Sequence, residues 1–285
     1  MTNALPLAQT IVPDFVASLT AQSAAARIFR EGLQLSFGRA GQIAVPTLEG
    51  DPSFAAFVQE GYPIPVVQAQ FEPLTILTPH KLAAVVVLTS EMVQSSNVEA
   101  LMQDALKRAA GLALDKALLD DVAGDATRPA GLRYGIPPLT ASTAPDPVAA
   151  LMTDIETLHR AVAPVTAGDA IFVMSPTRAL MAGLRSQHGL TPLKFIPSPA
   201  LRGTMIMMAV APNNIVSAFG DTPEITASRE TALHMETAPL PDEMLPTGPA
   251  RSLFQTDCVA IKLRLPVSWG VRSSQGVSWL VTSNW

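Results

Sequence analysis

The residue types that most often build metal centres and nucleophiles are few and widely separated in this sequence. The four histidines, His80, His159, His188 and His234, include no pair with the spacing of metal ligands on one helix. Cys258 is the only cysteine, so a disulfide within the chain and a cysteine-based zinc site are both excluded. Its place inside a strand-like run favours a packed thiol over a nucleophile. The histidines are therefore interpreted as structural or surface residues, and no metal or cofactor is predicted.

Two further groups have the residue types of a functional site without the surroundings that such a site needs. Ser175, in VMSPTRA, follows a strand-like run and precedes a helix, as a hydrolase nucleophile does, but it lacks the flanking glycines of that turn. A helix-capping role is the simpler interpretation. Asp120, Asp121 and Asp125 could hold a divalent cation weakly, and a solvated helix end explains them equally simply. No residue is predicted to be catalytic.

Composition limits the partners of the chain. Only 15% of residues are charged and 48% are apolar, which is a more apolar balance than the surface of a monomer usually allows. The surplus indicates subunit contacts. The net charge is −5 and the arginines are scattered, so specific nucleic-acid recognition is not expected, although weak contact with packaged DNA stays open.

Neither a membrane span nor a signal peptide is predicted. The long uncharged run over residues 203–220 is interrupted by Pro212, Asn213 and Asn214, and it never gives about 20 continuous apolar residues. The N-terminal residues lack the basic start and apolar core of a signal peptide. We therefore expect synthesis in a cytoplasm and no membrane partner.

Hydrophobic patterning predicts an arm and helix over residues 1–31, followed by an extended excursion over residues 32–72. The excursion holds two strand-like runs separated by GRAG at 38–41, which is interpreted as a hairpin turn. Pro63, Pro65 and Pro73 then stand where a central strand would not tolerate them. An excursion of this length within a compact domain indicates an external partner.

Residues 71–89 are predicted to form one long strand with a break near Thr78 and Pro79, and residues 98–122 a helix that Gly124 ends. On this interpretation Leu112→Asp would bury an unpaired charge and prevent folding. The apolar stripe assigned to the helix consists of Val98, Leu101, Met102, Ala105, Ala109, Leu112, Ala113, Ala117 and either Leu119 or Val122.

The second half of the chain alternates helix and strand. Asp146 and Pro147 are predicted to begin a helix, followed by a strand at 170–174, a helix at about 177–187 and a strand at 205–210. The last part reads as a long strand in which Val259, Ile261 and Leu263 face away from Lys262 and its neighbours. The predicted fold class is α+β.

Four segments, in this order, are similar to segments of a known family. They are AFVQEGYPIP at 56–65, FEPLTILTPHKLAAVVVLTSEMVQSS at 71–96, the 97–122 helix with the following GDATRPAGLRYG, and the closing stretch from CVAIKLRLPVSW to the end. Together they resemble the major capsid protein of tailed bacteriophages, which has the Hong Kong 97-type fold. The likeness spans nearly the whole chain, and its specificity lies in the order of the segments.

The resemblance implies a division of the chain and an assembly. It implies an N-terminal arm and helix over 1–31, an extended β-hairpin loop over 32–72, a peripheral domain with a long spine helix over 73–145, an axial α/β domain over 146–240, and return strands of the peripheral domain over 241–285. Subunits of this family form pentamers and hexamers of an icosahedral shell around double-stranded DNA. Loop residues expected to contact a neighbouring subunit are Phe37, Arg39, Phe54, Phe57, Glu60 and Tyr62.

The resemblance also limits the partners. Some relatives cross-link their shell through a lysine of the extended loop, whereas residues 32–72 contain no lysine, so we expect non-covalent cohesion. The main partner is another copy of the chain, and a scaffolding protein, a portal protein and a decoration protein stay open. The expected location is the virion capsid, assembled in the cytoplasm of a bacterial host.

Two alternatives are kept. The first shares the fold and is an encapsulin-like or gene-transfer-agent shell protein. The second is a cytoplasmic α/β enzyme, for which the signature would be a spatial cluster of the four histidines or an acidic pocket at Asp120, Asp121 and Asp125.

Overall fold

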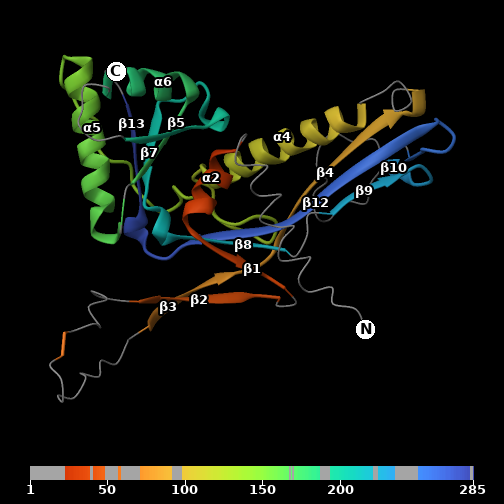
Figure 1. Cartoon of the computed structure of the whole chain (residues 1–285), viewed down its shortest axis with the longest axis horizontal. Helices are drawn as coiled ribbons and strands as arrows, with labels where there is room; N and C mark the ends of the chain where they lie inside the picture. Colours follow the sequence, from red (N-terminus) through yellow and green to blue (C-terminus); the bar gives the residue numbers. More distant parts are fainter. Residues whose placement is uncertain are drawn as a thin grey trace.

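The computed structural model describes residues 23–38, 41–48, 57–58, 71–91, 98–166, 168, 170–186, 193–220, 224–234, 250–282 and 285. These residues form mixed helix and sheet, as predicted (Figure 1). The helices are α2 (Ala24–Glu31), α4 (Val98–Leu118), α5 (Pro147–Val162) and α6 (Pro176–Ser186). None of the helices in the described residues is long and apolar enough to span a lipid bilayer.

The long sheet is built around β12 (Cys258–Val271). On one side β12 pairs antiparallel with β4 (His80–Thr89), and on the other with β8 (Ile215–Phe219) and β9 (Glu224–Ser228). Along β12, Val259, Leu263 and Leu265 are buried while Lys262 and Arg264 are exposed, which confirms the predicted alternation. Helix α4 lies along this sheet (Figure 1) and packs Leu106 against Leu88 and Ile261.

Helix α4 buries a different face from the predicted one. Leu106, Ala110, Leu114 and Leu118 are each less than 5% exposed, whereas Leu112 is 37% exposed. Ala105, Ala109 and Ala113 of the predicted stripe are exposed as well. The helix also ends at Leu118 rather than near Gly124. The sequence misleads because apolar residues occur around the whole helix, so its periodicity does not single out one face.

The corrected face gives a matched pair of variants. We expect Leu114→Asp to prevent folding or to lower the free energy of unfolding by about 4 kcal/mol. Leu114 is 1% exposed, and the charge of an aspartate there would have no partner. Leu112→Asp should change the free energy of unfolding by less than about 1 kcal/mol, since solvent reaches that side chain. Urea denaturation of the unassembled subunits measures both, and equal losses would contradict the burial of one face.

A second, shorter sheet has the strand order β13–β7–β5–β6. Helices α5 and α6 cover one face of it, where they bury Phe172, Met174, Met207 and Leu280. Asp146 caps α5 by accepting a hydrogen bond from the Ala149 amide, as predicted. The strands are β5 (Ile171–Met174), β6 (Lys194–Pro197), β7 (Ile206–Val210) and β13 (Val277–Val281).

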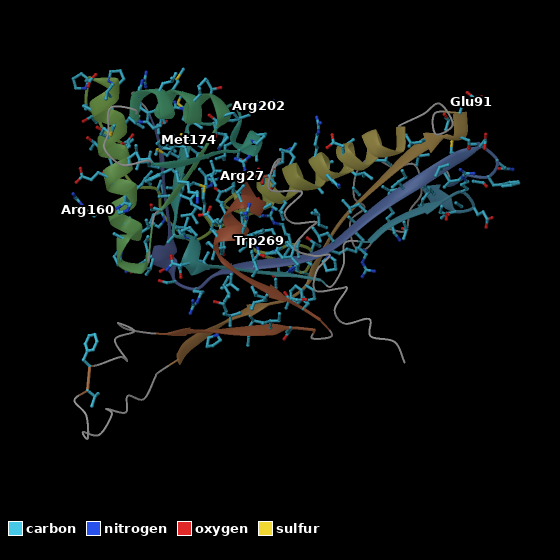
Figure 2. All side chains as sticks on the ribbon, viewed as in Figure 1. Arg27, Glu91, Arg160, Met174, Arg202 and Trp269 are labelled. Atoms are coloured by element: carbon cyan, nitrogen blue, oxygen red, sulfur yellow. The ribbon has the colours of Figure 1, made fainter. Side chains whose placement is uncertain are left out.

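The other face of the short sheet shares a core with the long sheet and with α2. The Phe29 ring of α2 lies 5.8 Å from the Phe219 ring of β8 and 5.9 Å from the Trp269 ring of β12. Figure 2 shows Trp269 where the two sheets meet, between Glu91 at one end of the molecule and Arg160 at the other. The sheets therefore divide the chain differently from the expected ranges, because β8 and β9 join the long sheet and β13 joins the short one.

The expected hairpin around residues 38–41 is wrong. β1 (Leu33–Ser36) pairs parallel with β8 at the edge of the long sheet, whereas β2 (Ile43–Leu48) pairs antiparallel with β3 (Phe71–Leu77). β1 and β2 are therefore neighbours in sequence but not partners. The predicted break between two strands at Thr78 and Pro79 is confirmed, because β3 ends at Leu77 and β4 begins at His80. Two short strands, β10 (Ala232–His234) and β11 (Ala250–Ser252), pair separately.

Candidate functional site

The residues considered for metal binding do not meet in the described structure. His80 places its Nε2 3.2 Å from the Asp125 carbonyl, and His159 lies exposed on α5. His188 lies outside the described residues. No group of three or more histidine, cysteine, aspartate or glutamate side chains with metal-site geometry occurs within the described part of the chain.

The two candidate nucleophiles have ordinary surroundings. Cys258 begins β12, is partly buried, and its Sγ lies 3.2 Å from the Thr256 carbonyl. Ser175 is 5% exposed and directly precedes α6, where its carbonyl accepts the Ala179 amide. Within the described part of the chain, neither residue forms a hydrogen bond with a histidine that could act as a base.

The acidic residues after α4 hold their own loop. The Arg128 guanidinium donates to both carboxylate oxygens of Asp120, at 2.7 Å each, and to the Ala117 carbonyl at 3.1 Å. Asp125 accepts from the Thr127 amide and hydroxyl, both at 2.6 Å, and from the Arg128 amide at 3.0 Å. Two of the three acidic side chains are thus occupied by internal hydrogen bonds. The arrangement secures the end of α4.

These contacts lower the pKa of Asp125, first through the Thr127 hydroxyl, then through the Thr127 and Arg128 amides and the Arg128 charge. A lowered pKa means that the loop gains stability above the ordinary pKa and loses it as the pH falls through the lowered one. In an NMR titration we expect the pKa of the Asp125 carboxyl to lie below the ordinary value of an aspartate. Thr127→Val should raise that midpoint, and an unchanged midpoint would contradict the assignment to the hydroxyl.

Gly131 lets this loop fold back onto the end of α4. A Cβ at Gly131 would lie 2.1 Å from Asp120 Oδ1 and 2.3 Å from the Asp120 carbonyl oxygen. Arg128 holds that carboxylate, so it has little freedom to move. We expect Gly131→Ala to lower the free energy of unfolding, measured by urea denaturation, by about 3 kcal/mol. Gly41→Ala is the matched control, because a Cβ there meets nothing within 4 Å.

The β2–β3 hairpin forms the base of the extended excursion, below the long sheet in Figure 1. It docks through a small core in which Val45 and Leu77 pack with Phe37, Val216 and Ala218. Strand β12 passes close to β3: the Thr75 hydroxyl lies 3.4 Å from the Val271 carbonyl. A Cβ on Gly270 would lie 2.5 Å from Thr75 Cγ2, so the glycine permits the approach. The hairpin is therefore attached to the rest of its own subunit.

The expected contact residues of the loop fall into three groups. Phe37 is 4% exposed and packs within its own subunit, so it does not offer its ring to a neighbour in this structure. Phe57 is fully exposed and the adjacent Val58 is 38% exposed. Arg39, Phe54, Glu60 and Tyr62 lie outside the described residues. A contact between any of these residues and a neighbouring subunit stays a prediction.

The residue that positions helix α2 has no signal in the sequence that marks it as functional. Asp115 of α4 is fully buried, and its carboxylate accepts four hydrogen bonds. Oδ1 accepts from the Ser23 hydroxyl at 2.6 Å and the Ala25 amide at 2.9 Å, and Oδ2 from the Ala24 amide at 3.0 Å and the Ser198 hydroxyl at 2.7 Å. A negative group at the start of α2 also suits its helix dipole. Asp115 therefore ties α2, α4 and the turn after β6 together.

Large apolar side chains remain exposed at several places on the described surface. Phe254 is 80% exposed in the turn before β12, and Leu180 and Leu184 of α6 are 65% and 60% exposed. Exposed apolar groups mark binding surfaces only where they form a contiguous patch, and Phe254 lies on a different element from Leu180 and Leu184.

The chain is similar to a known protein family and to several solved structures. Residues 5–185 match the model of the phage capsid family. A search of curated proteins finds no similar sequence. A structure from Microbacterium phage Oxtober96 is 15% identical, with a TM-score of 0.63, over 92% of this chain and 91% of that one.

Two further structures share the fold. One, from Mycobacterium phage Bobi, is 13% identical with a TM-score of 0.64, over 92% of this chain and 91% of that chain. The other, a virus-like particle from Pyrococcus furiosus, is 8% identical with a TM-score of 0.56, over 93% of this chain and 95% of that one. Since the family model covers more than half of the sequence, this chain belongs to the phage capsid family and is a structural protein of a capsid shell.

Proposed function

We propose that this chain is the major shell subunit of a tailed phage with the Hong Kong 97-type fold, and that it assembles into pentamers and hexamers of an icosahedral shell around double-stranded DNA. The observation that carries the proposal is the family match over residues 5–185, which includes the arm, the excursion and α4. The apolar, weakly charged composition supports it, because permanent assemblies bury roughly 2,000–5,000 Å² or more per interface.

Within this proposal each part of the chain has a place. The long sheet with α4 forms the peripheral domain, and the short sheet with α5 and α6 forms the axial domain. The excursion between β2 and β3, which includes the exposed Phe57, lies across a neighbouring subunit. Cohesion is non-covalent because residues 32–72 contain no lysine. The acidic net charge of −5 limits binding to packaged DNA to weak, non-specific contact.

A shell without a phage genome is the second candidate. The structural similarity to a virus-like particle from Pyrococcus furiosus supports the hypothesis of an encapsulin-like shell. A gene-transfer agent would use the same shell. Particles of all three kinds would look alike, and the nature of the cargo separates them. Scaffolding, portal and decoration proteins remain proposed partners, and assembly in the cytoplasm of a bacterial host remains the proposed route.

The test is the mass and shape of the expressed protein. Light-scattering chromatography with negative-stain microscopy should find closed shells or five- and six-fold rings. Nuclease-protected double-stranded DNA in particles from infected cells would support the phage reading. A chain that stays a 30.1 kDa monomer at high concentration and with its candidate scaffold would contradict the proposal.

A further inference from the structure

Trp285 is held by charged side chains of helices α5 and α6. It is 9% exposed and belongs to the core that these helices cover, and Figure 1 shows the end of the chain between them. The indole Nε1 donates to Asp154 Oδ2 of α5 at 2.7 Å. The Trp285 carbonyl accepts from Arg178 Nη1 of α6 at 2.7 Å, and the Arg178 guanidinium lies over the ring, 5.1 Å from its centroid. The residue is therefore bound at its ring edge, its ring face and its backbone.

The contacts of Asp154 and Arg178 suit an indole better than another aromatic ring. Asp154 is 1% exposed, and its Oδ1 accepts from the Ser142 amide at 2.6 Å, which fixes the orientation of the carboxylate. A phenylalanine in place of Trp285 would supply no donor to Oδ2, and a buried acceptor without a donor is costly. A guanidinium also binds the face of an indole more strongly than that of a benzene ring.

The Asp154 charge stays compensated when the ring is absent. Burial, and next the charge of Arg185, lower the pKa of Arg178, whereas the charge of Asp154 raises it, so Asp154 and Arg178 interact electrostatically. That interaction does not need the indole, and neither does the hydrogen bond from the Ser142 amide. Departure of Trp285 therefore does not leave an isolated buried charge, which would be the most costly outcome.

Trp285 is attached by side chains rather than by a sheet. Strand β13 ends at Val281, and the amide and hydroxyl of Thr282 both donate to the Met205 carbonyl, at 2.8 and 3.0 Å. Trp285 itself lies in neither a helix nor a strand, so its departure breaks no hydrogen bond between β13 and β7. A segment held in this way opens at a much lower free energy than a core strand.

We propose that Asp154 and Arg178 form an indole-specific site in which Trp285 docks reversibly, leaving and returning while the short sheet stays folded. We call this contact the Trp285 latch. A free indole should bind the same site when the Trp285 side chain is removed. The latch is a property of the single subunit, so it goes beyond the proposed shell function and does not rest on it.

The three tryptophans of the chain provide the first test. Trp269 of β12 and Trp279 of β13 also donate their Nε1 hydrogens to carbonyls, at 2.8 and 2.7 Å, but from within the sheets. NMR of unassembled full-length subunits resolves the exchange of each indole hydrogen with solvent. We expect the Trp285 hydrogen to exchange at least about tenfold faster than the Trp269 hydrogen, because it needs only local opening.

A matched pair of arginine variants tests the site itself. Arg178→Gln removes the hydrogen bond to the Trp285 carbonyl and the cation over the ring. It should speed exchange at Trp285 by about tenfold more and leave Trp269 unchanged. Arg160→Gln is the control, because Arg160 is an exposed arginine of α5 that pairs with Glu156 and lies outside the site. It should change neither rate.

The second test refills the site from solution. Indole should raise the melting temperature of Trp285→Gly by about 3 °C or more, and the rise should saturate with concentration. The compound 1-methylindole has the same ring system and no N–H donor for Asp154, so its effect should be less than half as large. The wild type, whose site is filled, should show a much smaller rise than the variant.

Each part of the proposal has a result that contradicts it. Equal exchange at Trp285 and Trp269 in the wild type would overturn reversible docking, and equal rates in Arg178→Gln and Arg160→Gln would overturn the part assigned to Arg178. Equal effects of indole and 1-methylindole, or no effect of either, would overturn the indole-specific site. Should Trp285→Gly fail to fold, the exchange rates decide. None of these measurements requires particles, so the proposed shell function stands or falls separately.

Discussion

Replacing Asp115 with alanine is expected to lower the free energy of unfolding by about 4 kcal/mol, enough to unfold a marginal subunit. The variant leaves four buried hydrogen-bond donors without an acceptor: the hydroxyls of Ser23 and Ser198 and the amides of Ala24 and Ala25. Each unpaired buried donor costs about 1–3 kcal/mol, and the costs are not additive because the site relaxes. Urea denaturation of unassembled subunits, followed by tryptophan fluorescence, measures the loss.

Two variants separate the loss of the four Asp115 hydrogen bonds from a general effect of removing a negative charge. Ser198→Ala removes one donor and leaves the carboxylate with three, so we expect a loss of about 1 kcal/mol. Asp121→Asn changes a carboxylate that is 64% exposed and should alter stability by less than about 0.5 kcal/mol. Trypsin should cut Asp115→Ala after Arg30 faster than the wild type, because α2 loses its anchor. A loss below about 1 kcal/mol in Asp115→Ala would show that the four donors find other acceptors.

Asp115 also shows why the buried face of α4 could not be read from the sequence. An aspartate in a helix is ordinarily taken as a mark of the solvent side, so Asp115 gives no indication that its face of α4 is buried. The structure buries Asp115 because Ser23 and Ser198, far away in sequence, complete its hydrogen bonds. A buried residue whose hydrogen-bond partners are far away in sequence has no neighbouring residues that indicate its burial.

The wrong prediction of strand pairing has the same cause. GRAG at 38–41 has the composition of a hairpin turn, yet β1 pairs with β8, about 180 residues further along the chain. The sequence pattern describes each strand correctly but not its partner, because pairing depends on which apolar faces meet in the core. Local signals succeeded where local physics decides: proline after Thr78 ended a strand, Asp146 capped α5, and alternation along β12 matched its burial.

For the candidate functional residues, too, the sequence predicted some features correctly and others wrongly. The absence of paired histidines and of a nucleophile motif directed attention to assembly, and the family match over residues 5–185 agrees with that direction. The sequence also singled out Phe37, whose apolar character suits an interface and a core equally well. The structure places it in the core with Val45 and Leu77. Hydrophobicity alone cannot separate the two locations, because both remove the same side chain from water.

Excising residues 49–70 is expected to leave a folded subunit that cannot form shells. Leu48 and Phe71 are direct partners in the β2–β3 pair, so a two-residue Asn-Gly turn can join them in the existing register. Val45 and Leu77 stay in place, and the small core that they share with Phe37 is kept. The urea midpoint should therefore match that of the wild type, whereas microscopy and light scattering should find no closed particles.

The choice of end points makes this variant decisive. A wider deletion over residues 36–68 would also remove Phe37 and Val45, which are 4% and 5% exposed, and its failure could reflect a lost core. Phe57→Gln is the graded companion, since it alters one fully exposed ring and leaves the loop length unchanged. It should raise the concentration needed for assembly without affecting stability. Particles of wild-type yield from the excised subunit would show that shell cohesion does not depend on the extended loop.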